Sequence, residues 1–439
     1  MRGRLFALPL GILLCASVVS TPLALAAPAT PYQITVVADR GDALYEVSKP
    51  AKFKVSLKNA GKPLEAEVVF TLDNDGMPSI RQGKLKLDKN GSGVIEGTLK
   101  EPGFLRCRVI FMDKDKKSVF AMASAGFDPQ KIPPSMPAPD DFDAFWAAQK
   151  ARLAKVEIKP TLTPVKSPVE GVECFDVQVP CVDPRPVSGY FARPAGAKPK
   201  SLPAILNVHG AGVRGSSLPA AAGSAKQFHA LGMDINAHGI PNGKDDKFYQ
   251  ELDRGELKGY RHAGRENRDT CYFLGMYLRL VRAIDFLTAQ PEWDGRVVVI
   301  RGTSQGGGQS IVAAGLDNRV TFLSAGVPAM CDHSGKVAGR INGWPKLVPD
   351  NNNKPDPKVL QVARYFDCQN FAPRSKAQAL VSVGFVDAVC PPTSVYAAYN
   401  ALPQPKSIYC EPLTGHASMA KFNDLTTEAI RKHIAEKKK

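Results

Sequence analysis

The 439-residue length predicts two or three domains rather than one. A hydrophobic content of 44% and an aromatic content of 8% are typical of a folded globular protein and exclude a disordered or low-complexity chain. The net charge of +15 is scattered, with basic runs only at 114–117 and 437–439, and no nucleic-acid-binding motif accompanies it. We therefore expect no nucleic-acid partner, and a basic surface that suits adhesion to cell-wall or plant polymers.

The first residues have the pattern of a secretory signal peptide, assigned to residues 1–26. Arg2 and Arg4 supply the positive start, residues 5–19 are apolar, and Ala24-Leu25-Ala26 is a small-x-small cleavage site. We expect cleavage before Ala27 and an exported protein, periplasmic or extracellular. Neither the apolar stretch nor any later one is suited to a membrane span.

Eight cysteines remain once Cys15 is removed with the signal peptide. An oxidising compartment permits disulfides, and Cys174 could pair with Cys181, or Cys390 with Cys410. Buried free thiols are an equally open alternative for each pair. No CxxC or Cys/His spacing typical of a metal site occurs, so the cysteines predict no metal.

Residues 27–127 predict an all-β domain. Short alternating segments are separated by Asn, Asp and Gly turns, as at 73–76 and 89–91, and this regularity favours an immunoglobulin-like β-sandwich. The expected strands are 33–38, 51–59, 66–72, 83–87, 93–99, 103–112 and 118–123. The aromatic residues Tyr45, Phe53, Phe70 and Phe104 stand mostly at core positions, which favours packing on the next domain over glycan binding, although glycan binding stays open. A Pro-rich linker is expected at 128–139.

Residues 140–439 predict an α/β domain. A helix over 140–153 carries Phe142, Phe145 and Trp146 on one face, and segments 172–180 and 187–194 resemble a hairpin. Further strands are expected at 204–209, 296–301, 379–386 and 407–411, and helices at 268–289, 306–315 and 426–437. This alternation predicts a mostly parallel sheet covered by helices on both faces.

One segment carries a candidate nucleophile. The buried strand at 297–300 leads into Gly302-Thr303-Ser304-Gln305-Gly306 and then into a helix of small residues. Gly-x-Ser-x-Gly alone is a common pattern, but strand, motif and helix together are typical of the nucleophile elbow of the α/β-hydrolase fold. The two glycines are expected where side chains would collide with neighbouring backbone. Ser304 is therefore the predicted nucleophile.

The partners of Ser304 follow from chain order, since this fold places the acid and then the histidine after the serine. Three histidines follow: His433 lies in a Lys-rich terminal helix and is expected to be solvated, and His333 precedes the strand that should carry the acid. His416 follows the last expected strand and is the predicted general base. Asp387 alone among the intervening acids stands directly after an apolar strand, so we predict that it orients His416.

The oxyanion hole requires two backbone N–H groups. Gln305 follows the nucleophile and supplies the first. The second is expected from Ala211, in the loop His209-Gly210-Ala211-Gly212 that follows the strand at 204–208, because a Gly-rich turn lets backbone approach a substrate closely. His209 itself is expected to be structural.

Several of these segments resemble the acetyl xylan esterase/cephalosporin C deacetylase family. The resemblance covers about 135–435 and rests on the His209-Gly210 loop, the elbow at 302–308, the Asp-x-x-Cys-Pro-Pro sequence at 387–392, Gly415-His416 and the helix at 141–146. It implies removal of acetyl groups from sugar hydroxyls, with Ser304, Asp387 and His416 as the triad and with neither metal nor cofactor. Family members commonly have an aromatic residue where Ala211 stands, and simple members are cytoplasmic hexamers of one domain.

Two other functional classes stay open from the sequence. One is a serine hydrolase of another kind on the same fold, such as a peptidase or a glucuronate ester hydrolase, because fold alone does not decide function. The other is a glycan-binding or structural protein with a vestigial hydrolase domain, which the complete set of Ser304, Asp387 and His416 disfavours. The oligomeric state is open as well.

Overall fold

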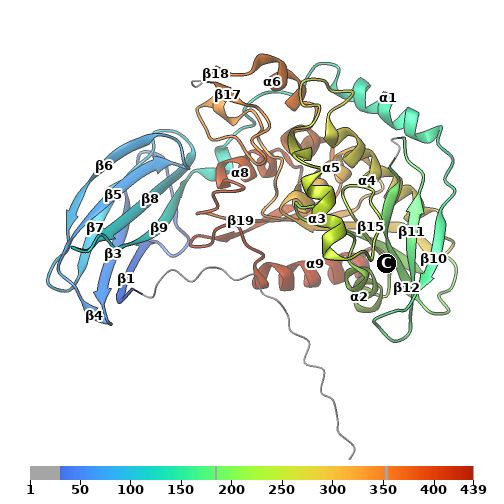
Figure 1. The fold of residues 1–439 in the computed structure, drawn as a ribbon, viewed down its shortest axis with the longest axis horizontal. Helices are drawn as coiled ribbons and strands as arrows, with labels where there is room; N and C mark the ends of the chain where they lie inside the picture. Colours follow the sequence, from blue (N-terminus) through green and yellow to red (C-terminus); the bar gives the residue numbers. More distant parts are fainter. Residues whose placement is uncertain (1–29, 183–184, 352–353, 439) are drawn as a thin grey trace, which may run out of the picture.

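The computed structural model describes residues 30–182, 185–351 and 354–438. Figure 1 shows an all-β part formed by the N-terminal residues beside a larger part in which helices surround a sheet. The predicted signal peptide lies outside the described residues. Within the described ranges, no helix is both long and apolar enough to cross a membrane.

The N-terminal part consists of two sheets over residues 32–127. One sheet joins β1, β3, β4 and β7, and the other has the order β2-β9-β8-β5-β6. The seven predicted strands all occur, and two short ones, β2 and β4, were not predicted. Their bounds are β1 Tyr32–Ala38, β2 Leu44–Tyr45, β3 Ala51–Asn59, β4 Lys62–Pro63, β5 Glu67–Asn74, β6 Ser79–Lys86, β7 Ser92–Gly97, β8 Gly103–Met112 and β9 Ser118–Phe127.

Alternating side chains explain why these strands form two layers. In β3, Phe53, Val55 and Leu57 are buried, whereas the alternating lysines at 52, 54 and 58 are exposed. Residues two apart lie on the same face of a strand, so one face of β3 joins the core between the sheets. Phe104 is different, because it packs with the core of the following domain rather than with that of the sandwich.

The Pro-rich segment after the sandwich is held against the larger part of the molecule. Ile132 is buried, and Asn400 donates hydrogen bonds to the carbonyl oxygens of Pro129 and Ile132, both at 2.9 Å. Helix α1, Phe142–Ala154, follows and buries the three aromatic residues expected on its inner face.

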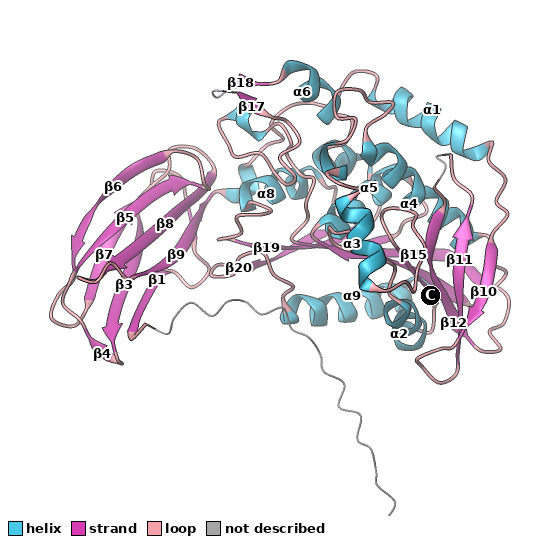
Figure 2. Ribbon diagram, viewed as in Figure 1, coloured by secondary structure: helices cyan, strands magenta, loops and turns pink. Residues whose placement is uncertain are grey.

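The larger part is built on a nine-stranded sheet of order β10-β11-β12-β14-β13-β15-β16-β19-β20. Figure 2 shows strands of this sheet with helices around it. Pairing is antiparallel from β10 to β14 and parallel from β14 to β20. The bounds are β10 Thr161–Val165, β11 Val172–Val179, β12 Val187–Pro194, β13 Leu202–Val208, β14 Leu231–Ile235, β15 Trp293–Thr303, β16 Phe322–Gly326, β19 Gln378–Gly384 and β20 Lys406–Glu411. The mixed, mostly parallel sheet agrees with the predicted fold class.

Helices cover both faces of this sheet, and the central strand β15 shows why. Val298 and Ile300 belong to the core shared with α1, α4, α5 and α8, whereas Val297 and Val299 pack toward α2 and α9. A strand buried on both sides reads as a continuous apolar run, as this one does. The helix bounds are α2 Leu218–Phe228, α3 Asp246–Arg254, α4 Tyr272–Thr288, α5 Gln305–Leu316, α6 Pro357–Ala363, α7 Cys368–Phe371, α8 Pro392–Ala401 and α9 Ala420–Lys438.

The cysteines form no disulfide within the described residues. The Cys174 thiol donates to the Ser167 hydroxyl, and the Cys410 thiol contacts the Tyr396 hydroxyl at 3.3 Å. For both candidate pairs that the sequence left open, the structure therefore has separate thiols and no disulfide.

Candidate active site

The turn between β15 and α5 presents Ser304 at the carboxyl edge of the sheet. Ser304 has φ 61° and ψ −122°, a conformation that side-chain-bearing residues rarely adopt and that surrounding structure must hold. A Cβ on Gly302 or on Gly306 would lie 2.4 or 2.2 Å from the Val208 carbonyl oxygen. Only glycine therefore allows β13 to approach the turn this closely.

The three predicted triad residues come together at this edge. His416 Nε2 lies 2.9 Å from Ser304 Oγ, and His416 Nδ1 lies 2.8 Å from Asp387 Oδ2. Ser304 follows β15, Asp387 lies beyond the end of β19, and His416 follows β20, so the carboxyl ends of three parallel strands supply the group. The arrangement can pass a proton from the serine hydroxyl to an imidazole that a carboxylate orients.

Asp387 is fixed by its own loop. The side chain is 1% exposed, and its Oδ1 accepts hydrogen bonds from the backbone N–H groups of Val389 and Cys390, each at 2.8 Å. These two bonds occupy one carboxylate oxygen and turn the other toward His416. The buried carboxylate is thus held in a single orientation by backbone rather than by flexible side chains.

The loop expected to complete the oxyanion hole lies beside the nucleophile. A Cβ built on Gly210 would be 3.6 Å from the Ser304 Cβ, which places the next residue, Ala211, at the same edge. His209 holds this loop: its Nδ1 lies 2.6 Å from the Gly210 carbonyl oxygen and its Nε2 accepts from the Ala237 N–H. Burial lowers the pKa of His209 to about 4, so the ring is neutral at pH 7.

Tyr260 is a site residue that the sequence analysis missed. Its hydroxyl donates to Gln305 Oε1 at 2.9 Å and accepts from the Gly212 N–H at 3.3 Å, so it joins the two segments expected to form the oxyanion hole. Tyr260 is 2% exposed although it lies in the long connection between β14 and α4. Its neighbours in the sequence include Gly and charged residues, which are typical of an exposed loop, so the burial of Tyr260 could not be predicted.

Replacing Tyr260 with phenylalanine is expected to lower kcat about tenfold while KM changes little. The variant keeps the ring but leaves Gln305 Oε1 buried without its donor and releases the Gly212 loop. Ester hydrolysis should be measured per active serine. Tyr249→Phe, in the same connection between β14 and α4, is the matched control, because the Tyr249 hydroxyl bonds only to Pro241 and Lys244 in the described structure. An unchanged kcat in Tyr260→Phe would contradict the linking role.

The other two histidines considered as bases lie elsewhere. His433 was expected to be solvated, and this is wrong: it is 4% exposed, and its Nε2 lies 2.9 Å from Thr321 Oγ1 beneath the sheet. The reason is that α9 turns this face inward despite its many lysines. His333 is fully buried and stacked on Phe273, and burial lowers its pKa to about 3.

A third side chain accompanies the acid and the base. Asp387, Cys390 and His416 each offer a potential metal-ligand atom, and these atoms lie within 4.8 Å of one another. Both carboxylate oxygens of Asp387 already serve the hydrogen bonds described above, and burial holds the pKa of the Cys390 thiol well above its usual range. The group is therefore better suited to proton transfer than to binding a cation.

Comparisons with known proteins identify the family of this chain. Residues 129–433 match the acetyl xylan esterase (AXE1) family. Acetyl esterase Axe7A of Xylanibacter ruminicola is 33% identical over 407 residues, which are 92% of this chain and 91% of that protein.

Two solved structures share the fold of the larger part. Acetyl xylan esterase from Paenibacillus sp. R4 is 26% identical with a TM-score of 0.58, over 69% of this chain and 98% of its own. Acetyl xylan esterase 1 from Thermoanaerobacterium sp. JW/SL YS485 is 24% identical with a TM-score of 0.60, over 70% and 97%. The chain thus has an α/β-hydrolase-like fold, belongs to the acetyl xylan esterase family and is a carboxylic ester hydrolase.

Proposed function

We propose that this protein is an exported serine esterase that removes acetyl groups from acetylated xylan or related sugar esters. Ser304 is the nucleophile, His416 the general base and Asp387 the acid that orients the base. The observation that carries the proposal is the continuous hydrogen-bonded series from Ser304 Oγ through His416 to Asp387, with both distances below 3 Å. Family membership supports the acetyl sugar ester as substrate class.

Hydrolysis proceeds in two halves. Ser304 Oγ attacks the acetyl carbonyl carbon while His416 Nε2 takes the hydroxyl proton; the bond to the sugar oxygen then breaks, and His416 returns the proton to that oxygen. Water attacks the acetyl-Ser304 ester next, His416 accepts its proton, and acetate leaves as Ser304 regains its hydroxyl. The Asp387 carboxylate stabilises the imidazolium in both halves.

The oxyanion is stabilised by the backbone N–H groups of Gln305 and Ala211. Gln305 is the first residue of α5, so the positive end of the helix dipole adds to its N–H. The Ala211 side chain is small, so it leaves more room for the acyl group of the substrate than an aromatic residue at this position would.

Acetate release across a substrate panel tests the substrate class. We expect acetylated xylan and acetylated xylo-oligosaccharides to be deacetylated well above background, and glucuronate methyl esters and peptide p-nitroanilides to be poor substrates. Cleavage of the amides without acetate release would overturn the proposal in favour of a peptidase. Preference for the glucuronate ester would indicate the other ester class.

The domain assignments belong to the same proposal. Residues 1–26 are a signal peptide cleaved near Ala26 and Ala27, 27–127 an immunoglobulin-like sandwich, 128–139 a linker and 140–439 the catalytic domain. Two facing sheets of mainly antiparallel strands support the sandwich assignment. N-terminal sequencing of the exported protein tests the cleavage site.

A further inference from the structure

One side chain of the N-terminal domain reaches into the catalytic domain. Asp75, in the turn between β5 and β6, is 3% exposed, and its Oδ2 accepts hydrogen bonds from the Thr393 backbone N–H, at 3.1 Å, and from the Thr393 hydroxyl. The turn itself is well held. The Asp75 N–H donates to the Phe104 carbonyl oxygen at 2.9 Å, and the nearby Asp73 pairs with Arg106.

This contact provides a cap that helix α8 lacks in its own sequence. Pro391 stands at the N-cap position and supplies no side-chain hydrogen bond. A carboxylate that accepts from the second residue of a helix stabilises its first turn and complements its dipole. Burial raises the pKa of Asp75 to about 7, opposed by the Thr393 bonds and the positive charge of Arg106. Removing this carboxyl from water is costly, and its partners on α8 offset that cost.

Phe104 of β8 makes a second contact with the catalytic domain, at the start of the loop that carries Asp387. Its ring packs edge to face on Phe385, with centroids 4.9 Å apart, and lies 5.5 Å from the Tyr396 ring of α8. All three rings are buried. Phe385 stands two residues before Asp387, so the N-terminal domain touches the acid loop before and after the carboxylate.

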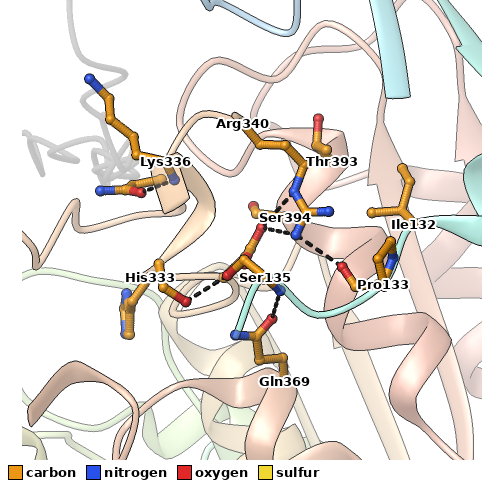
Figure 3. A network of polar contacts seen from close by, with 12 residues as sticks. Ile132, Pro133, Ser135, His333, Lys336, Arg340, Gln369, Thr393 and Ser394 are labelled. Atoms are coloured by element: carbon orange, nitrogen blue, oxygen red, sulfur yellow. Dashed lines mark hydrogen bonds and ion pairs between the residues drawn. The ribbon is translucent and has the colours of Figure 1, made fainter. Parts of the chain in front are cut away.

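The interdomain segment reinforces this arrangement. Arg340 donates to the Pro133 carbonyl oxygen at 2.9 Å, the Ser135 hydroxyl lies 2.6 Å from the Ser334 hydroxyl, and Gln369 Oε1 accepts from the Ser135 N–H. Figure 3 shows this network, with Thr393 and Ser394 of α8 drawn beside it. Residues 129 and 132 are also bonded to α8 through Asn400. The sandwich thus contacts α8 through Asp75 and Phe104, and the linker is bonded to α8 through Asn400.

We propose that Asp75 is a positioning residue for the triad acid, and that the N-terminal domain forms part of the support of the active site. Asp75 holds the first turn of α8, and only residues 388–391 separate that turn from Asp387. The N–H groups that fix Asp387 Oδ1 belong to Val389 and Cys390, within this short connection. A shift of α8 therefore moves the donors that aim Asp387 at His416. The inference rests on the proposed triad.

Asp75→Ala tests the proposal in the full-length protein. We expect kcat for a small chromogenic acetate ester to fall about tenfold and KM to stay within about twofold, because a sub-ångström misplacement of an orienting group slows chemistry without removing substrate contacts. Rates are divided by the amount of serine that reacts with a fluorophosphonate probe, so a smaller fraction of folded protein does not lower the measured kcat. Asp75→Asn, which keeps an acceptor for the Thr393 N–H, should recover most of the loss.

Asp88→Ala is the matched control, because Asp88 also accepts backbone N–H groups in a turn of the sandwich, those of Asn90 and Ser92, away from α8. Its kcat should equal that of the unmodified protein. If Asp75→Ala fails to fold, Thr393→Val removes only the hydroxyl bond and should lower kcat about threefold. Unchanged kcat per reactive serine in the folded variants would overturn the inference. Activity retained by Ser304→Ala would instead overturn the proposed triad.

Discussion

Ser304→Ala is expected to lower kcat for acetate esters by about 10⁵- to 10⁶-fold, with KM little changed. The substitution removes the only atom that can carry the acetyl group, whereas the oxyanion donors and His416 stay in place. Any residual rate then reflects direct attack by water on the bound ester. Acetate release should fall by this factor, and the pre-steady-state burst of chromophore, measured with substrate in excess over enzyme, should vanish.

Ser310→Ala is a matched control in the same helix. Ser310 is buried, and its hydroxyl donates to the Gly306 carbonyl oxygen at 2.9 Å without contacting the triad. The variant should retain kcat and covalent labelling by a fluorophosphonate. Turnover in Ser304→Ala comparable to that of this control would mean that another group is the nucleophile.

The three triad residues could be predicted from their order along the chain because the fold is regular. Parallel strands end at one edge of the sheet, so a serine, an acid and a histidine that each follow a strand are expected to meet there. The short apolar run before Asp387 and the strand before His416 marked two of these ends, and the elbow glycines marked the third. The structure brings all three side chains within hydrogen-bonding distance.

Two short strands and one buried histidine could not be predicted in this way. The strands β14 and β16 have only five residues each, too few for a periodic pattern to stand out. His433 lies among lysines, but the helix turns it onto Thr321, more than 100 residues earlier. The many lysines of α9 lie on its exposed face, and they give no sign that its other face is buried.

Asp75 shows the same limit most clearly. In the sequence it is one of several acidic residues in a polar turn, and such residues are usually solvated. Its partner Thr393 is 318 residues away, and only docking of the two domains buries the pair. Sequence reasoning favoured packing of the sandwich on the catalytic domain from its few aromatic residues, and Phe104 makes that contact.

Asp387→Asn is expected to lower kcat by about 10³- to 10⁴-fold because it changes the tautomer of His416. The N–H groups of Val389 and Cys390 can donate only to the carbonyl oxygen of the new amide, so its NH₂ group must face His416 Nδ1. The imidazole then accepts at Nδ1 and carries its proton on Nε2, where it can no longer take the proton of Ser304. The fold and KM should be nearly unchanged, since the amide has the shape of the carboxylate.

Asp356→Asn is the control for this substitution. Asp356 accepts the N–H groups of residues two and three positions ahead, Lys358 and Val359, as Asp387 does, but it has no histidine partner among the described residues. Its kcat should match that of the unmodified protein. The two variants are compared by steady-state kinetics on a chromogenic acetate ester. The amount of labelled Ser304 gives the concentration of active sites. A loss of less than tenfold in Asp387→Asn would mean that the orientation of His416 is set by other groups.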